Sequence, residues 1–209
     1  RPALVLREMM RVAETGIVSF SNYGHIGLRL TLMLRGRMPR LFARSEPMAF
    51  NTARVLSQGT DVTVLSTGIC TEEAMRALSV LSERGLSIQH LHISTLKPFT
   101  DPQILDAIKK AKHGVITMEN HTIVGGLGSA VAELIAENGI GQKLVRIGLK
   151  DTYAHGASQH YLMKEYGLDA MALVNAIEKL VSRRLGLTED DLLAVRIEPV
   201  HSAAKAEAL

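Results

Sequence analysis

The sequence predicts an α/β fold in which helices cover both faces of a mostly parallel, five-stranded sheet, giving three layers in the order α/β/α. Short apolar runs with β-branched residues, such as Val62–Leu65, alternate along the chain with longer segments of helical periodicity. Runs without polar alternation are typical of strands that are buried on both faces. The stretch Val115–Val131 contains a strand, a glycine turn and the start of a helix, which together make half of a parallel crossover.

The bulk composition limits the class of protein. The chain has 209 residues, of which 46% are hydrophobic, and this suffices for one domain with additional segments. Its one cysteine excludes an intramolecular disulfide, and charged residues interrupt every candidate for a membrane span of ~20 apolar residues. No signal peptide is evident, so we expect a cytoplasmic protein without membrane contacts. The sequence starts at Arg1 and not at Met, which suggests a fragment or a processed form.

The net charge of +3 is unevenly distributed along the chain. Residues 1–45 contain eight arginines and two glutamates, and the rest of the chain carries a net charge of −3. A basic end of this kind can indicate a nucleic-acid partner. Here the arginines are spread among Leu, Met and Val, and the whole chain has only four Phe and four Tyr that could stack on bases. We therefore expect no nucleic-acid binding.

The first 48 residues differ from the remainder in pattern as well as in charge. Residues 1–20 have an approximate helical stripe, and strict alternation over Ile26–Leu34 predicts a strand that ends in the basic turn Arg35–Pro39. The stretch 43–48 has the composition of a linker with a proline stop. We therefore divide the chain into residues 1–45, a main domain over 46–185 and a C-terminal tail over 186–209.

The main domain is predicted to start with a β-hairpin. Two short strands, Ala53–Leu56 and Val62–Ser66, are separated by a loop of suitable length. Thr71 is placed to cap the helix that follows, which has two glutamates in its first turn and Gly85 at its end.

The remaining elements continue the alternation of strand and helix. A strand over Ile88–Ile93 precedes a helix with Asp101 as N-cap and proline at its first position. The central stretch comes next, and a further strand is expected over Leu144–Ile147. Two helices are expected over 158–166 and 169–185, and no clear period is present beyond them.

Polar residues and glycines follow the central strand. Glu119–Thr122 is predicted to be a corner where the chain leaves the sheet, and three glycines then precede the helix: Gly125, Gly126 and Gly128. One explanation is an anion site, with backbone N–H groups and the positive end of the helix directed at a phosphate. The other is that glycine allows the helix to start tightly against its strand. The spacing Gly-Gly-Leu-Gly matches neither the dinucleotide fingerprint nor a phosphate loop, so the residues favour the second explanation.

Five segments carry a resemblance to a known family. They are GTDVTVLSTG, LKPFTDPQI, TMENHTIVGGLGSAVAE, RIGLKDTYAHG and YGLDA, in this order over about residues 46–182. Together they resemble the C-terminal domain of the transketolase superfamily, which includes transketolase, deoxyxylulose-phosphate synthase and the β subunits of 2-oxoacid dehydrogenases. The five segments are most similar to those of split transketolases, in which one polypeptide carries the diphosphate-binding part and another carries the pyrimidine-binding and C-terminal parts.

The resemblance implies a thiamine-diphosphate enzyme that transfers a two-carbon ketol unit between sugar phosphates. In this family a Gly-Asp-Gly…Asn site holds the diphosphate through Mg2+, and this chain contains no Gly-Asp-Gly. The resemblance therefore implies a C-terminal component that is inactive alone and acts in a homodimer or heterotetramer with a diphosphate-binding subunit, or with a diphosphate-binding domain if the chain is the tail of a larger enzyme. Residues 1–45 would be the end of a pyrimidine-binding domain. No catalytic residue or metal ligand is assigned to this chain, and its cofactor-binding residues remain unknown.

The resemblance also implies two kinds of functional residue. The basic turn resembles an arginine turn in which one arginine is expected to bind the substrate phosphate, and of Arg35 and Arg37 the first is the favoured match. On the residues alone, Arg35 is instead a solvated surface arginine. Glu119 and His121 could form an acid–base pair or an interface hydrogen bond, and the residues leave both possibilities open. We expect an interface or structural loop formed by Glu119, His121, Gly125, Gly126 and Gly128.

Other polar residues have a functional and a structural explanation. His90 and His92 alternate along a predicted strand and share a face, as a metal pair would require. Because no third ligand is evident, the structural explanation is favoured. Cys70 lies near a predicted helix N-terminus, which can lower a thiol pKa, but a buried inert cysteine is the better interpretation. His155 lies in a polar loop without an assigned role.

Three alternatives to a transketolase component stay open. Two are enzymatic, a deoxyxylulose-phosphate synthase component and a 2-oxoacid dehydrogenase β-type component. The third is a non-catalytic domain that only assembles a dimer, with Glu119–Thr122 and residues 1–45 as partner-facing surface. A neighbouring gene that encodes a Gly-Asp-Gly…Asn site would favour an enzyme subunit over a free-standing module.

Overall fold

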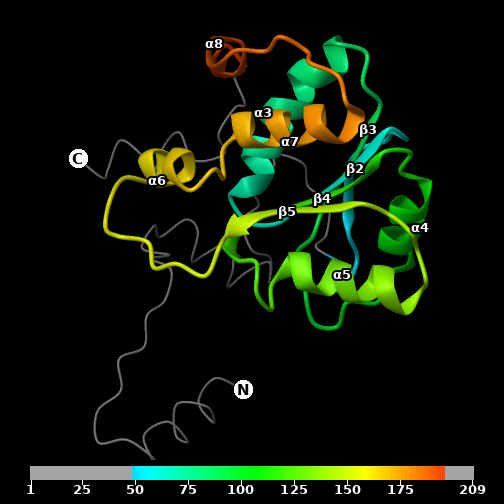
Figure 1. The fold of residues 1–209 in the computed structure, drawn as a ribbon. Helices are drawn as coiled ribbons and strands as arrows, with labels where there is room; N and C mark the ends of the chain where they lie inside the picture. The colour runs from blue at the N-terminus through cyan, green and yellow to red at the C-terminus, as the bar shows by residue number, and fades with distance from the viewer. Residues whose placement is uncertain (1–48, 196–209) are drawn as a thin grey trace, which may run out of the picture. The chain divides into compact units, whose positions relative to one another are not determined.

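A five-stranded sheet with the strand order β1-β3-β2-β4-β5 lies at the centre of the fold (Figure 1). The structure is a computed structural model that describes residues 49–195, all of which belong to one compact unit. The strands are β1 (Arg54–Ser57), β2 (Val62–Ser66), β3 (Ile88–His92), β4 (Gly114–Thr122) and β5 (Leu144–Leu149). The helices are α3 (Cys70–Glu83), α4 (Pro102–Lys110), α5 (Leu127–Glu137), α6 (Gln159–Glu165), α7 (Ala170–Val181) and α8 (Glu189–Leu193).

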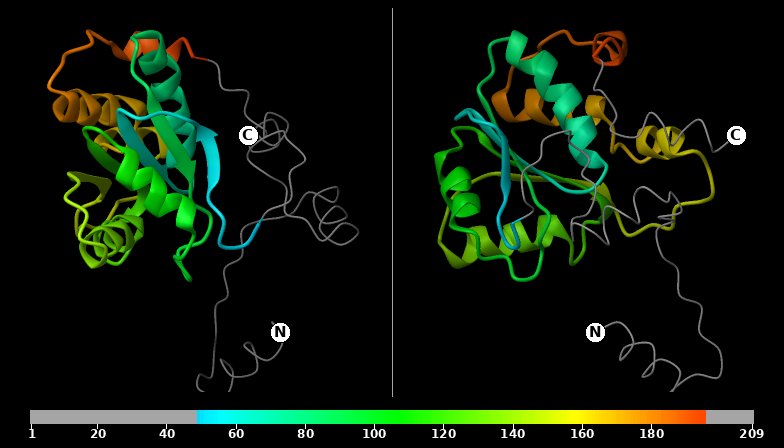
Figure 2. Two further views of the ribbon diagram at one scale, coloured as in Figure 1. Left: turned by 90° about the vertical axis from the view of Figure 1, so that its right-hand side faces the viewer. Right: turned by 180° about the vertical axis from the view of Figure 1, so that it is seen from behind.

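The sheet separates two hydrophobic cores. Helices α3 and α7 cover one face of the sheet, and α4 and α5 cover the other (Figure 1; Figure 2 shows the same layers from the side and from behind). Along β2, Val62 and Val64 face the α3 side, whereas Leu65 packs on the α4 and α5 side. All five residues of β2 are buried, as expected for a central strand covered on both faces. The predicted three-layer α/β architecture with a mostly parallel sheet is confirmed.

The predicted hairpin between the first two strands is wrong. Strand β1 pairs with β3 in antiparallel orientation, while β2 pairs with β3 and β4 in parallel. Both hydrogen-bonding edges of β2 are therefore occupied by parallel partners, and β1 covers the outer edge of β3 instead. The hydroxyl of Ser57 fixes this position by donating to the carbonyl of Ile88 at 2.8 Å.

The helix starts follow the expected capping pattern in two cases. The Asp101 carboxylate accepts from Gln103 N at 3.0 Å at the start of α4, and Asp169 accepts from Ala172 N at 2.9 Å at the start of α7. The expectation for Thr71 is wrong. Helix α3 begins at Cys70 without a side-chain cap, and the Thr71 hydroxyl is buried within its first turn.

The end of the domain differs from the expected tail. Helix α7 ends at Val181 because Ser182 adopts a left-handed conformation with φ of 53°. The short helix α8, absent from the sequence prediction, then starts with a reciprocal capping box between Thr188 and Asp191. Its Leu192 is buried in the core on the α3 side, so the ordered fold continues beyond Leu185.

The expected basic segment and the expected absence of a membrane span concern different parts of the chain. Arg35 and the rest of the segment 1–45 lie outside the described residues. Within residues 49–195, no helix has the length and apolar character needed to span a bilayer.

Candidate functional site

The carboxyl ends of β2 and β4 mark a reversal in the order of the strands. The chain passes from β2 through α3 to β3 on one side, and from β4 through α5 to β5 on the other. In open α/β sheets, ligands bind outside the carboxyl ends of the strands at such a reversal. The two ends are in contact here, since Thr67 N donates to Met118 O at 3.1 Å and Gly68 packs against the Asn120 side chain. We therefore expect functional residues at this edge of the sheet.

Strand β4 extends further than the sequence predicted. The chain does not leave the sheet at Glu119, because β4 continues to Thr122 and its pairing with β5 shifts register between Met118 and Thr122. Thr122 is paired with Leu149, and Ile123 N donates to Leu149 O at 2.9 Å. The predicted corner is therefore an irregular continuation of the strand, which sequence periodicity does not reveal.

Glu119 is the most deeply buried acid at this edge. Its side chain is 1% exposed, and its two carboxylate oxygens accept from Leu127 N and Gly128 N, each at 2.8 Å. These amides belong to the first turn of α5, where the helix dipole favours negative charge. Glu119 therefore occupies the position in which the sequence pattern allowed an external anion. The turn is filled by the protein's own carboxylate.

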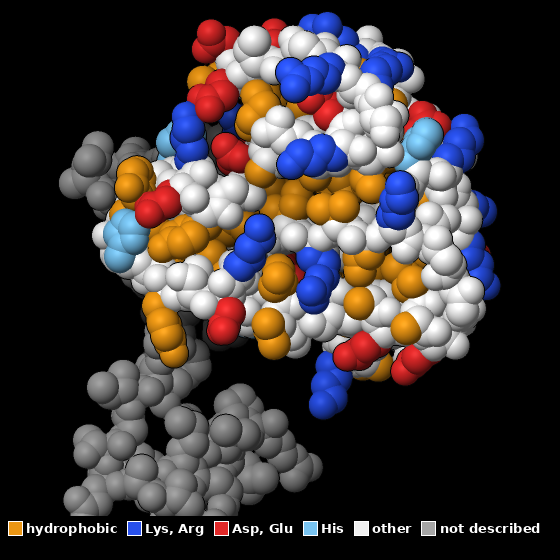
Figure 3. Space-filling view, viewed as in Figure 1, with side chains coloured by type: hydrophobic (Ala, Val, Ile, Leu, Met, Phe, Trp, Pro, Cys, Tyr) orange, Lys and Arg blue, Asp and Glu red, His pale blue; other side chains and the backbone are white. Residues whose placement is uncertain are grey.

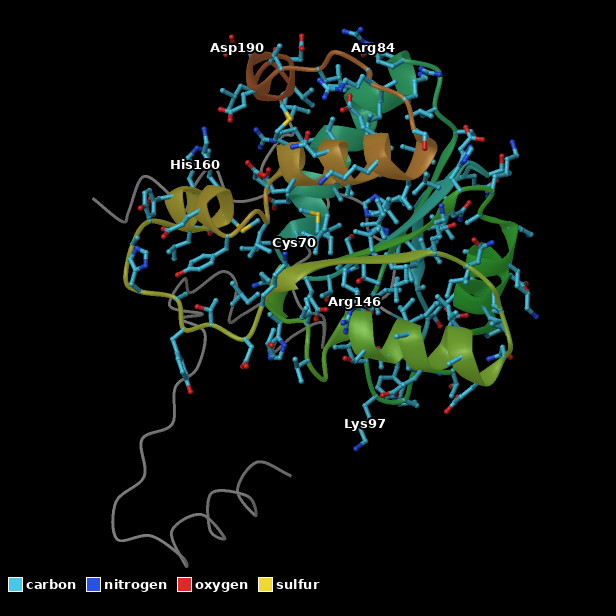
Figure 4. The ribbon with its side chains drawn as sticks, viewed as in Figure 1. Cys70, Arg84, Lys97, Arg146, His160 and Asp190 are labelled. Carbon is cyan, nitrogen blue, oxygen red and sulfur yellow. The ribbon has the colours of Figure 1, made fainter. Side chains whose placement is uncertain are left out.

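The glycines of the turn permit this close approach. A Cβ atom on Gly126 would overlap the Glu119 carboxylate. A Cβ atom on Gly128 would lie 2.7 Å from Arg146 Cδ and 3.0 Å from Thr117 Oγ1. Arg146, on β5, indeed lies beside the first turn of α5 (Figure 4). The geometry supports the explanation that glycine allows α5 to start tightly against its strand.

His121 and Gly125 lie on the outer surface of the same segment. Both residues are exposed, and the ring nitrogen Nδ1 of His121 donates to Thr122 O at 3.0 Å. Within the described part of the chain, the hydrogen bonds of Glu119 go to backbone amides. Glu119 and His121 are therefore not brought together as an acid–base pair. The adjacent Val124 is a large apolar residue with 66% exposure.

A second polar cluster lies at the carboxyl ends of β2 and β3. Ser66 Oγ lies 2.7 Å from His90 Nε2 and 3.0 Å from Thr71 Oγ1, and Thr71 Oγ1 lies 2.8 Å from His92 Nδ1. Burial, and next the charge of His92, lowers the pKa of His90 to about 3. Burial and then Arg54 also lower the pKa of His92. Both imidazoles are therefore neutral at neutral pH.

The two histidines are held by hydroxyl groups. Among the described residues, no group of three or more His, Cys, Asp or Glu side chains could hold a metal ion. The sequence missed the partners Ser66 and Thr71, although both flank the glycine turn that directly follows a buried strand. Polar residues at such a strand end were the available signal.

Cys70 and His155 take no part in the hydrogen bonds of Glu119. Cys70, at the start of α3 (Figure 4), is fully buried. Burial, reinforced by Glu73 and Glu119, raises the pKa of Cys70 to about 12, so the thiol is inert near neutral pH. His155 lies near α6, where its ring contacts Tyr161 edge-on and its Nε2 lies 3.5 Å from a Glu165 oxygen.

The comparisons with known proteins agree with this architecture. The family profile "Transketolase, C-terminal domain" matches residues 51–173. The chain belongs to this family. The profile of a different family, methionine biosynthesis protein MetW, matches residues 1–57.

Two relatives are described as parts of transketolases. The chain is 38% identical over 148 residues to a putative transketolase C-terminal section from Methanocaldococcus jannaschii, covering 68% of this chain and 46% of the relative. It is 33% identical over 183 residues to the 6-deoxy-6-sulfo-D-fructose transketolase subunit SqwH from a Clostridium species, covering 88% of this chain and 56% of the relative. The chain therefore spans about half the length of these curated relatives.

Two further matches widen the comparison. A 1-deoxy-D-xylulose-5-phosphate synthase from Syntrophotalea carbinolica is 32% identical over 149 residues, covering 71% of this chain and 23% of the synthase. A solved structure described as a split gene transketolase, inactive beta4 tetramer, is 30% identical with a TM-score of 0.62. That match covers 69% of this chain and 46% of the solved chain.

Proposed function

We propose that this chain is the C-terminal component of a split, thiamine-diphosphate-dependent transketolase that transfers a two-carbon ketol unit between sugar phosphates. The observation that carries the proposal is the family match over residues 51–173, together with relatives described as a transketolase C-terminal section, a transketolase subunit and a split gene transketolase. A diphosphate-binding subunit would be the partner. The complex would work in the cytoplasm as a homodimer or heterotetramer.

The residues of this chain do not fit a diphosphate holder. When bound, thiamine diphosphate would supply the electron sink for the two-carbon unit. The sequence has no Gly-Asp-Gly, and the glycine turn before α5 is filled by Glu119. A phosphate placed at Leu127 N and Gly128 N would compete with a buried carboxylate of the same charge sign. We therefore assign the cofactor and Mg2+ to the partner, and no catalytic step to the described residues.

The part played by the described domain would be assembly. The turn that contains Glu119, His121, Gly125, Gly126 and Gly128 projects an exposed apolar residue, Val124, from a rigid base. Rigid apolar residues at a loop tip are effective contacts because they lose little conformational entropy on binding. The solved relative described as an inactive beta4 tetramer supports the expectation that chains of this type assemble without being active alone.

Residues 1–45 would complete the substrate site as the end of a pyrimidine-binding domain. The aligned 183 residues of the Clostridium relative exceed the 161 residues that follow Met48, so that similarity extends into residues 1–48. The MetW match over residues 1–57 favours a different origin for this segment. We retain the assignment to transketolase because the Clostridium alignment joins both parts in one relative.

Arg35 would bind the anionic end of the substrate. A guanidinium presents a planar fork of donors that matches phosphate oxygens. Arg35→Ala should raise the KM for phosphorylated substrates, which corresponds to a loss of binding free energy on the order of 2–4 kcal/mol. It should lower kcat less, because the phosphate lies away from the reacting carbonyl. Steady-state kinetics of the assembled enzyme measure this effect. An unphosphorylated acceptor such as glycolaldehyde should be almost unaffected, and equal losses for both acceptors would remove Arg35 from the site.

A deoxyxylulose-phosphate synthase component is the second candidate. It is favoured by the 32% identity to the synthase over 149 residues. The test is to combine this chain with the diphosphate-binding subunit encoded beside it and to measure ketol transfer and deoxyxylulose phosphate formation in parallel. We expect ketol transfer by the mixture and none by either chain alone. Deoxyxylulose phosphate formation without ketol transfer would favour the synthase, and neither activity would favour a non-catalytic assembly domain.

A further inference from the structure

Four polar side chains from three elements form a linear hydrogen-bonded chain on the α3 side of the sheet. The order is His90 Nε2, Ser66 Oγ, Thr71 Oγ1 and His92 Nδ1, with successive separations of 2.7, 3.0 and 2.8 Å. His90, Ser66 and Thr71 are 1%, 0% and 0% exposed, while His92 is partly exposed. The chain therefore connects a half-buried imidazole to a fully buried imidazole without passing through solvent.

The number of hydrogens restricts how this chain can be arranged. It contains three links, and each link requires one hydrogen between its two heavy atoms. The two hydroxyl groups supply one hydrogen each. The third hydrogen must come from one of the imidazole nitrogens that face inward, either His90 Nε2 or His92 Nδ1. If both carried hydrogen, one donor would face another donor, and if neither did, one link would be lost.

We propose that Ser66, Thr71, His90 and His92 form a one-proton relay that couples the protonation state of His92 to the tautomer of His90. In the geometry observed, Ser66 donates to Thr71. Thr71 must then donate to His92, and His90 Nε2 must donate to Ser66. Protonation of His92 would place a hydrogen on its Nδ1 and reverse all three bonds. The hydrogen on His90 Nε2 would pass to Ser66, while Ser66 passes its own to Thr71, Thr71 passes its own to His92 Nδ1, and the incoming proton binds at His90 Nδ1. His92 would then carry hydrogen on both nitrogens, and His90 would stay neutral, accepting at Nε2 and carrying its hydrogen on Nδ1.

The charges around the relay favour the neutral arrangement. Arg54 on β1 is paired with His92 across the antiparallel ladder, and the N-terminal end of α3 adds positive potential beside Thr71. Two carboxylates lie close to Cys70, the residue before Thr71: Glu73 on α3 and Glu119 on β4, and both raise the pKa of that thiol. Glu119 is itself held by two amides of α5, and Glu73 accepts from Ala170 N at 2.9 Å.

The relay has a structural consequence for α3. A single protonation at His92 reverses the hydrogen bonds between β3 and α3 but does not remove any of them. The first turn of α3 therefore stays attached to the sheet while His92 titrates. A second proton on His90 would create two inward donors and break one link. The relay is independent of the proposed transketolase activity, because it involves only contacts within residues 49–195.

The tautomers can be measured directly by NMR. The full chain is labelled with 15N-histidine, and His90 and His92 are assigned with the variants His90→Gln and His92→Gln. At pH 7.5 we expect a protonated Nε2 on His90 and an unprotonated Nδ1 on His92. The reversed pair, with hydrogen on His92 Nδ1 alone, would also support the relay. Hydrogen on both inward nitrogens, or on neither, would overturn it.

A matched pair of variants tests the coupling. Thr71→Val removes the hydroxyl that joins Ser66 to His92, so the tautomer of His90 should no longer change when His92 is protonated as the pH is lowered. Thr63→Val is the control, because Thr63 is equally buried on β2 and its hydroxyl donates to Ala107 O at 2.8 Å. His90 Nε2 should remain as in the wild type in this control. A His90 tautomer that still follows the protonation of His92 in Thr71→Val would show that the coupling does not pass through Thr71.

Discussion

The two helices that follow the central strands start in different ways, although both starts lie at the same edge of the sheet. Helix α5 begins on a buried carboxylate, since Glu119 accepts from two of its amides. Helix α3 begins without a side-chain cap, and its first turn is joined to the sheet through the neutral hydroxyls of Ser66 and Thr71. One start depends on a single charge, and the other depends on several neutral hydrogen bonds.

This difference indicates how the edge is used. The amides of α5 are occupied by Glu119, and the first turn of α3 carries two acids, Glu72 and Glu73. Neither helix start is suited to bind a diphosphate, because each already presents negative charge. The edge is therefore built for internal order, which agrees with the proposal that another chain holds the cofactor.

The largest effect is expected from removing the charge at α5. Glu119→Ala leaves two buried amides without acceptors, and we expect a loss on the order of 4 kcal/mol in the free energy of unfolding. Urea denaturation followed by circular dichroism measures the loss. Glu133→Ala, at an exposed position of the same helix, is the control and should change stability by less than about 0.5 kcal/mol. A similarly small change for Glu119→Ala would show that the Glu119 carboxylate does not stabilise the start of α5.

A somewhat smaller effect is expected from filling the space beside the carboxylate. In Gly126→Ala the new Cβ overlaps Glu119, and displacing the carboxylate should destabilise the domain by about 3 kcal/mol. Gly141→Ala has no neighbouring atom within 4 Å of the added Cβ and should be nearly neutral. The same urea titration compares the two variants. Equal stability would mean that the turn has more room than the structure indicates.

The α3 start should respond to pH through His90. The folded-state pKa of His90, about 3, lies below the ordinary value of 6.5, so the unfolded chain takes up this proton first. Stability should therefore be complete above pH 6.5 and should fall toward pH 3, with a slope of up to about 1.4 kcal/mol per pH unit from this group. His90→Gln should remove that part of the slope. An unchanged slope in this variant would show that His90 is not a buried neutral imidazole.

Local sequence rules predicted much of the fold. The strands predicted over Val62–Ser66 and Ile88–Ile93 and the caps Asp101 and Asp169 were visible because each depends on neighbouring residues. The pairing of β1 was not predictable in this way, since it depends on which strand edge is left open in the assembled sheet. Helix α8 was missed although its Thr188–Asp191 spacing carries the signal of a capping box.

The candidate site was only partly predictable for the same reason. Glu119 and the glycines stood out by composition, but the role of Glu119 depends on amides eight and nine residues further along the chain. The second cluster combines His90 with Ser66 and Thr71, which come from different elements. A single sequence does not show that these residues meet.

The most direct test of the central claim is calorimetric titration of the isolated chain with thiamine diphosphate and Mg2+. The claim is that this chain completes a transketolase but does not hold the cofactor. We predict no measurable heat of binding to the isolated chain and clear binding after the diphosphate-binding subunit is added. Micromolar affinity of the isolated chain for thiamine diphosphate would contradict the account, because it would require a diphosphate site that the described residues do not provide.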